Sequence, residues 1–205
     1  MRVLVTGADG FIGKNVLLHL FEAADVEVIC FTRDNSFAEL PRLLEGVGFI
    51  IHLAGVNRPD NAIEFTQGNV DLTEKLAQAM ISSGCKAPLI YASSIQASLD
   101  NPYGVSKRMA EDALLLLRKK YDIPVTVFRL PNVFGKWARP NYNSAVATFC
   151  HNIAHELPIQ INDPEALIDL VYIDDVVEQM ISIMHEDGHQ NEFFDITPVY
   201  KITVG

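Results

Sequence analysis

Apolar and polar positions in the first 135 residues alternate between two patterns. Five short, continuously apolar runs predict buried strands, at residues 2–7, 26–33, 48–55, 88–94 and 124–132. Between them, apolar residues recur at the spacing of one helical face and predict helices at 11–23, 36–46, 65–84 and 103–120. Continuously apolar strands that alternate with helices indicate a parallel sheet covered on both faces. The predicted fold class is therefore α/β, with a doubly wound parallel sheet.

The rhythm changes after about residue 135. Residues 137–163 read as a loop rich in proline and asparagine, a helix and a short strand. The stretch IDLVYIDDVVEQMISIMHE then predicts another strand and a helix capped by Asp174 or Asp175. We interpret residues 1–135 as a core and residues 136–205 as a small C-terminal lobe. The last residues, YKITVG, begin an element without completing it, so we expect the lobe to be truncated here.

Composition excludes several classes of partner. The 205 residues include 49% hydrophobic ones and carry a net charge of −10, which argues against nucleic acid or an anionic membrane as the main partner. No run approaches the roughly 18 consecutive apolar residues of a membrane span, and the first strand leaves no room for a signal peptide. Three cysteines, Cys30, Cys85 and Cys150, lie among apolar residues and read as reduced thiols. These features predict a cytoplasmic protein.

A glycine motif follows the first strand and opens the first helix. The segment TGADGFIG places Gly7, Gly10 and Gly13 at this junction. Gly7 permits a tight turn, Gly10 lets the backbone approach a pyrophosphate at the helix N-terminus, and Gly13 allows close packing of helix on strand. The motif therefore predicts a bound dinucleotide.

Four further short motifs follow the glycine motif along the chain. Residues 52–55 read HLAG, residues 91–94 YASS, residues 103–107 YGVSK and residues 129–135 RLPNVFG. With TGADGFIG, they resemble the extended branch of the short-chain dehydrogenase/reductase superfamily. The resemblance implies a Rossmann-like sheet, a dinucleotide-binding core and a substrate-binding lobe. It also implies cofactor contacts from Gly7, Asp9, Gly10, Phe11, Ile12, Gly13, Arg33, Leu53, Ala54, Gly55, Asn69, Tyr103, Lys107 and Leu130.

Tyr103 and Lys107 lie four residues apart at the start of a predicted helix, and so on one face of it. Asn101 or Asp100 can cap this helix, and Pro102 suits its first turn. The resemblance makes Tyr103 the proton donor to a reduced carbonyl and Lys107 the ammonium that lowers the tyrosine pKa and holds the nicotinamide ribose. It makes Ser94 the hydroxyl that polarises the carbonyl, whereas Ser93 reads as structural.

The end of the second strand bears on the choice of cofactor. The segment CFTRD places Thr32 and Arg33 where an NAD-preferring member of the family carries an acid, and Asp34 comes too late. A guanidinium can grip a 2′-phosphate through two hydrogen bonds. We therefore predict NADP(H).

Three longer stretches, HLAGVNRP, SSIQASLDNPYG and NVFGKWARPNYNSAVATFCHNIA, resemble the reductase domain of capsular-polysaccharide synthesis enzymes of the CapF type. That likeness implies reduction of the 4-keto group of a UDP-linked 2-acetamido-2,6-dideoxyhexose. It also implies that the metal-dependent epimerisation of the downstream cupin domain is absent from this chain. The substrate residues implied are Ser94, Ile95, Gln96, Asn132, Lys136 and Arg139.

Two features qualify the substrate site. Ile168 stands where many extended members keep an arginine for the nucleotide, so Arg58, Lys136 or Arg139 must serve the diphosphate instead. His151 and His155 have the spacing of metal ligands but no evident third ligand, so we predict no metal.

Two other functions remain open. An NAD-dependent nucleotide-sugar epimerase or dehydratase would retain its cofactor; Arg33 argues against it, as do Ile95 and Gln96, which stand where a dehydratase has an acidic pair. A non-catalytic NADP-binding regulator would often lack the Tyr103 and Lys107 pair. The predicted helices at 65–84 and 103–120 resemble those that pair two subunits in this superfamily, so a homodimer is expected.

Overall fold

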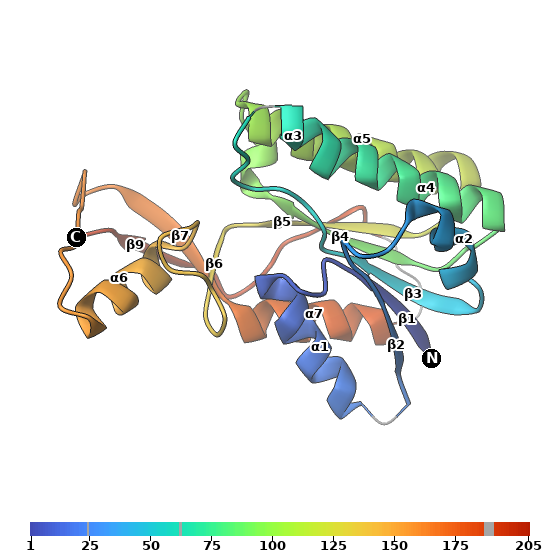
Figure 1. Ribbon diagram of the computed structural model, residues 1–205, viewed down its shortest axis with the longest axis horizontal. Helices are drawn as coiled ribbons and strands as arrows, with labels where there is room; N and C mark the ends of the chain where they lie inside the picture. Colours follow the sequence, from blue (N-terminus) through green and yellow to red (C-terminus); the bar gives the residue numbers. More distant parts are fainter. Residues whose placement is uncertain (24, 62, 187–190) are drawn as a thin grey trace.

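Two sheets organise the computed structural model, which describes residues 1–23, 25–61, 63–186 and 191–205 (Figure 1). The larger sheet has six parallel strands in the order β2-β1-β3-β4-β5-β8. The predicted α/β fold with a parallel sheet is confirmed. The strands are β1 (Arg2–Thr6), β2 (Glu27–Phe31), β3 (Val47–His52), β4 (Leu89–Ser94), β5 (Val125–Leu130) and β8 (Phe193–Phe194).

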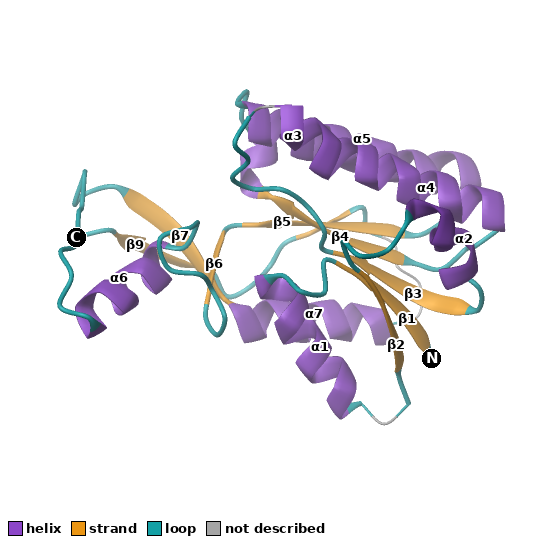
Figure 2. Ribbon diagram, in the orientation of Figure 1, coloured by secondary structure: helices purple, strands orange, loops and turns teal. Residues whose placement is uncertain are grey.

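Helices cover both faces of this sheet (Figure 2). One face carries α1 (Phe11–Glu22) and α7 (Ile173–His185). The opposite face carries α2 (Leu40–Leu43), α4 (Leu72–Ser83) and α5 (Pro102–Tyr121), with the short α3 (Ile63–Phe65) at the end of α5. The sheet is therefore doubly wound.

The alternation of side chains along β1 shows why both faces must be covered. Val3 and Val5 are buried in one apolar cluster, together with Val16 of α1 and Val176 of α7. Leu4 points to the other face and belongs to a second cluster with residues of α4 and α5. A strand buried on both faces has no polar side, which explains its continuous apolar run.

A smaller sheet lies beside one end of the core (Figure 1). It consists of β6 (Asn132–Phe134), β7 (Leu167–Tyr172) and β9 (Tyr200–Thr203), with α6 (Ala145–Ala154) next to it. The chain then returns to the core, because α7 packs on α1 and β8 pairs with β5. Within residues 136–205, α7 and β8 thus belong to the core, whereas the substrate-binding role of a lobe over these residues stays a prediction.

Several predicted elements have different ends in the structure. The helix expected at 65–84 consists of α3, a π-helical turn η2 (Thr66–Asp71) and α4, and it ends at Gly84 with a φ of 70°. The stretch 36–46 contains η1 (Phe37–Glu39) and then α2, with Pro41 in the first turn of α2. The fifth strand ends before Pro131, which separates β5 from β6.

Two local expectations were wrong. Neither Asp174 nor Asp175 caps α7, because the helix begins after Tyr172 with no side-chain cap and both acids lie in its first turn. In the first turn, their negative charges still interact favourably with the positive end of the helix dipole. The short strand expected before residue 163 is not formed, since residues 157–162 make no ladder hydrogen bonds.

Candidate active site

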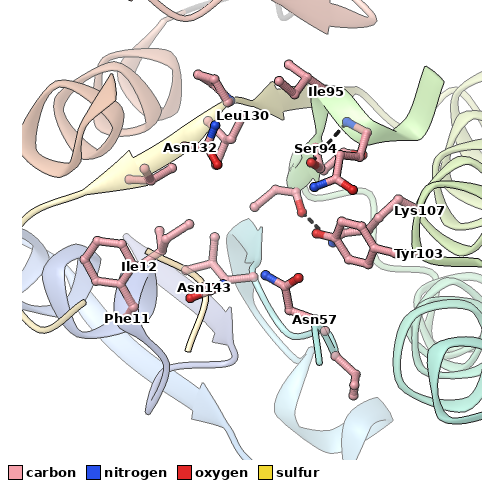
Figure 3. Close-up of a pocket in the computed structure, with 18 of the residues that line it drawn as sticks. Phe11, Ile12, Asn57, Ser94, Ile95, Tyr103, Lys107, Leu130, Asn132 and Asn143 are labelled. Atoms are coloured by element: carbon pink, nitrogen blue, oxygen red, sulfur yellow. Dashed lines mark hydrogen bonds between the residues drawn. The ribbon is translucent and has the colours of Figure 1, made fainter. Parts of the chain in front are cut away.

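A pocket of about 490 Å³ opens beyond the carboxyl ends of the central strands (Figure 3). It lies where the chain crosses from one side of β1 to the other, the usual ligand position in an open α/β sheet. The predicted site residues that line it are Phe11, Ile12, Leu53, Gly55, Ser94, Ile95, Gln96, Tyr103, Lys107, Leu130 and Asn132.

The glycine motif shapes one wall of this region. Gly7 has a φ of +69°, and a Cβ atom there would come within 2.7 Å of the Ala54 nitrogen. A Cβ atom on Gly13 would come within 2.2 Å of the Gly7 carbonyl oxygen. Helix α1 starts at Gly10 with no side-chain cap and no acid in its first turn, so its first amides remain available to an anion. The backbone therefore fits a dinucleotide pyrophosphate, which the Phe11 and Ile12 amides would hold, whereas the Gly10 amide already donates to the Gly7 carbonyl at 3.0 Å.

Asn69, a predicted cofactor residue, does not line the pocket, and its amide binds the protein itself. Its Oδ1 accepts a hydrogen bond from the Val56 backbone at 2.8 Å, and its Nδ2 donates to the Val56 carbonyl and to the Ser106 hydroxyl. The Thr6 hydroxyl accepts from the Ala54 backbone on the other side of the same loop. Asn69 is buried, so its role in this structure is to shape the loop that follows β3.

Ser94 and Tyr103 come together as the sequence predicts, through two local caps. The Ser94 hydroxyl accepts from the Gln96 backbone at 3.2 Å and so begins the turn η3 (Ile95–Ser98). The Asn101 side chain caps α5 by accepting from the Gly104 backbone at 2.7 Å, whereas Asp100 pairs with Arg108. The Ser94 and Tyr103 side chains both line the pocket, and their hydroxyls lie close enough for Ser94 to act on the Tyr103 pKa.

The charge state of the pair differs from the sequence expectation. Burial raises the pKa of Tyr103; the Ser94 hydrogen bond lowers it, and nearby Tyr142 adds to the rise. Burial lowers the pKa of Lys107 to about 8, against the opposing effect of Glu111. The expected lowering of the tyrosine pKa by Lys107 is therefore not the dominant effect here. Tyr103 keeps its proton at neutral pH, as a proton donor must.

The other predicted residues lie outside the pocket lining. They are Gly7, Asp9, Gly10, Gly13 and Ala54 around the glycine motif, Arg33 after β2, and Lys136 and Arg139 after β6. Arg33 is exposed.

The three cations that the sequence offers for a diphosphate lie near two aromatic rings, those of Trp137 and Tyr142. The Lys136 ammonium lies 4.4 Å from the Trp137 ring centroid. The guanidinium carbons of Arg58 and Arg139 lie 6.0 and 5.3 Å from the Tyr142 ring centroid. Of the three cations, only Arg58 lines the pocket.

Sequence reasoning missed two amide side chains in the pocket. Asn57 and Asn143 both line it, from the loop after β3 and from the loop before α6 (Figure 3). Asn57 stands between HLAG and Arg58, so its place after a strand was a usable signal. Nothing local in the sequence marks Asn143, because its loop approaches the pocket only in the folded chain.

The predicted histidine pair lies on and just after α6. The His151 and His155 rings are 4.2 Å apart, and the part of the chain that the structure describes contains no group of three metal-ligating side chains.

Comparison with known proteins identifies the family. A family model described as the NAD dependent epimerase/dehydratase family matches residues 3–197. The chain belongs to this family. The membership confirms the resemblance to extended short-chain dehydrogenases/reductases, which depend on NAD or NADP.

Two relatives and one more distant structure refine the comparison. A UDP-2-acetamido-2,6-beta-L-arabino-hexul-4-ose reductase from Pseudomonas aeruginosa is 54% identical over all 205 residues, which cover 55% of that protein. The capsular polysaccharide assembling protein CapF from Staphylococcus aureus is 39% identical with a TM-score of 0.87, over the whole chain and 56% of CapF. A UDP-glucuronic acid 4-epimerase from Bacillus cereus in complex with NAD, 20% identical, has a TM-score of 0.88 over the whole chain and 81% of its own, and shows the shared fold. The chain thus spans about half the length of its two nearer relatives.

Proposed function

We propose that this chain is an NADPH-dependent reductase of the 4-keto group of a UDP-linked 2-acetamido-2,6-dideoxyhexose, acting in the biosynthesis of capsule or O-antigen sugars. The observation that carries the proposal is the convergence of Ser94, Tyr103 and Lys107 on one pocket. The reductase from Pseudomonas aeruginosa, 54% identical, supports this choice of substrate.

The proposed reaction adds one hydride and one proton to the keto group. NADPH, when bound, would supply the hydride for the carbonyl carbon. Ser94 donates a hydrogen bond to the keto oxygen and withdraws charge from it. Tyr103 gives its phenolic proton to the same oxygen, which becomes the product hydroxyl, and the phenolate regains a proton from solvent. Lys107 keeps a positive charge next to the phenolate.

The test is oxidation of the nicotinamide cofactor, measured as the loss of the absorbance of its reduced ring. We expect oxidation of NADPH only when the UDP-linked 4-keto-6-deoxy-N-acetyl sugar is present. An epimerase or dehydratase would return its hydride and show no net oxidation. A regulator would bind NADPH without turnover. Either result would contradict the reductase assignment.

Arg33 carries the choice of cofactor. It is exposed after β2, in a turn closed by hydrogen bonds between Thr32 and Asn35. We expect Arg33→Gln to weaken NADPH binding by about 10- to 100-fold and to leave NADH binding within about twofold, because one charge-assisted contact to the 2′-phosphate is lost. Fluorescence titration of both nucleotides measures this. Arg42→Gln, on the short helix α2, is the matched control. Equal losses for NADPH and NADH would reject the assignment of the 2′-phosphate to Arg33.

The remaining proposals concern assembly and location. We propose a homodimer that pairs through α4 and α5, where a groove of about 570 Å³ runs between the two helices and exposes Leu116. Within the described ranges, no helix combines the length and apolar character needed to cross a membrane. The three free cysteines suit the reducing cytoplasm, where we propose that the protein acts.

A further inference from the structure

A second tyrosine lies under the pocket and contacts Lys107. Tyr91 of β4 is 1% exposed, and its hydroxyl oxygen accepts a hydrogen bond from the Lys107 ammonium at 3.1 Å. The ammonium also donates to the Ala92 carbonyl at 2.9 Å and lies 4.7 Å from the Tyr91 ring centroid. A lysine ammonium has three N–H donors. Two are therefore used by β4, and one is left for a group bound in the pocket that Lys107 lines.

The Tyr91 ring is itself held from below. It stacks on the His52 ring, with centroids 5.2 Å apart and an angle of 25°. Both nitrogens of His52 are engaged, Nδ1 with the Thr6 hydroxyl at 2.6 Å and Nε2 with the Thr73 hydroxyl at 2.9 Å. Burial, and then the charge of Lys107, lower the pKa of His52 to about 3. The supporting ring is therefore uncharged at neutral pH and adds no repulsion to the ammonium.

The other ionisable groups that face Lys107 do not replace Tyr91 as its partner. Glu111 lies one turn further along α5, and its carboxylate is bound by the Ser93 hydroxyl at 2.5 Å and by two Arg129 nitrogens at 3.1 and 2.6 Å. Burial raises the pKa of the Tyr103 phenol, which is also influenced by the Ser94 hydroxyl and by Tyr142. Tyr91 stays neutral because its burial raises the pKa of its phenol. The direct acceptors of the ammonium are thus the Tyr91 oxygen and the Ala92 carbonyl.

We propose that Tyr91 is a positioning residue for Lys107: it holds the ammonium at the floor of the pocket and stabilises its charged form, with His52 as its rigid support. The consequence for catalysis rests on the proposed reductase function, whereas the effect on Lys107 itself does not. The position of the charge is then decided by β4, before any ligand binds.

The substitution Tyr91→Phe tests this, since it removes the hydroxyl and keeps the ring. Loss of an acceptor disfavours the ammonium, so we expect the pKa of Lys107, about 8 in the unsubstituted protein, to fall by about one pH unit. An NMR titration of lysine labelled at Cε measures this in the free protein without turnover. In the reductase assay, the alkaline limb of the pH profile of kcat/KM should shift to lower pH by the same amount. At pH 8 this shift is about a fivefold loss of kcat/KM.

Thr126→Val is the matched control. It removes another buried hydroxyl, one that donates to the Asn191 carbonyl from β5, away from the pocket. A similar fall in Tm in both variants, with the Lys107 pKa lowered only by Tyr91→Phe, would support positioning. If the protein has no reductase activity but Tyr91→Phe still lowers the Lys107 pKa, the positioning role of Tyr91 is supported and only the proposed function is rejected.

An unchanged Lys107 pKa in Tyr91→Phe would overturn the proposal and leave Tyr91 a packing residue. One measurement needs no substitution: a nuclear Overhauser effect between the Tyr91 ring protons and the Lys107 ε-methylene protons should be present. Its absence would also overturn the proposal.

Discussion

Replacing Tyr103 with phenylalanine is expected to lower kcat for keto-sugar reduction by about 1,000-fold, because the substitution removes the proton donor. The ring remains and still packs near Phe65, whose centroid is 5.7 Å away, so the fold and the pocket should persist. The Kd of NADPH should change by less than about threefold, since the phenol makes one contact among many. Steady-state oxidation of NADPH and a fluorescence titration measure the two quantities.

The control for this substitution lies on the same helix. Tyr121 ends α5 and is 40% exposed, so Tyr121→Phe removes a hydroxyl far from the pocket. Its kcat should match that of the unsubstituted chain. Turnover by Tyr103→Phe within tenfold of normal would show that another group donates the proton. Loss of NADPH binding together with activity would point instead to a damaged pocket.

Replacing Gly13 with alanine is expected to affect both stability and cofactor binding. The added Cβ would come within 2.2 Å of the Gly7 oxygen and within 2.7 Å of the Ala8 oxygen, and both are backbone atoms that cannot move without moving the loop. Overpacking of about 3 kcal/mol should lower Tm by roughly 10 °C. The first turn of α1 would shift away from β1, so the Kd of NADPH should rise by at least about tenfold. Thermal unfolding and nucleotide titration measure these effects.

Gly84→Asn provides the comparison. Gly84 has a left-handed backbone, with a φ of +70°, and a Cβ atom there meets nothing within 4 Å. Asparagine tolerates this conformation, so Tm should change by less than about 3 °C. A Gly13→Ala protein with normal Tm and normal NADPH affinity would show that the close packing of α1 against the glycine loop is unnecessary.

Patterns within one stretch of the chain predicted the framework of the site correctly. The five apolar runs became β1 to β5, five of the six strands of the larger sheet, and Asn101 caps α5 so that Tyr103 and Lys107 share a face. These features depend on residues close together in sequence, where strand burial, helix periodicity and capping act locally. The same holds for the family, since its motifs are short and occur in order.

Features that join distant segments were not predictable from one sequence. The return of α7 and β8 to the core depends on which apolar surface of the sheet remains uncovered after α1, α4 and α5 have packed. Asn143 reaches the pocket across the chain, and no local pattern signals such a contact. Tyr91 is the first residue of the segment YASS, whose serines carry the sequence signal. Its contact with Lys107 joins β4 to α5 and depends on the folded chain.

The sequence by itself determined the parallel α/β fold, the glycine turn for a dinucleotide and the pair of Tyr103 and Lys107, because local periodicity and backbone conformation dictate each of them. The tertiary structure alone decided the protonation of that pair. Burial raises the pKa of Tyr103 and lowers that of Lys107, and the acceptors on β4 determine where the ammonium lies. Desolvation depends on every segment that packs around a group, so it exists only once the chain has folded.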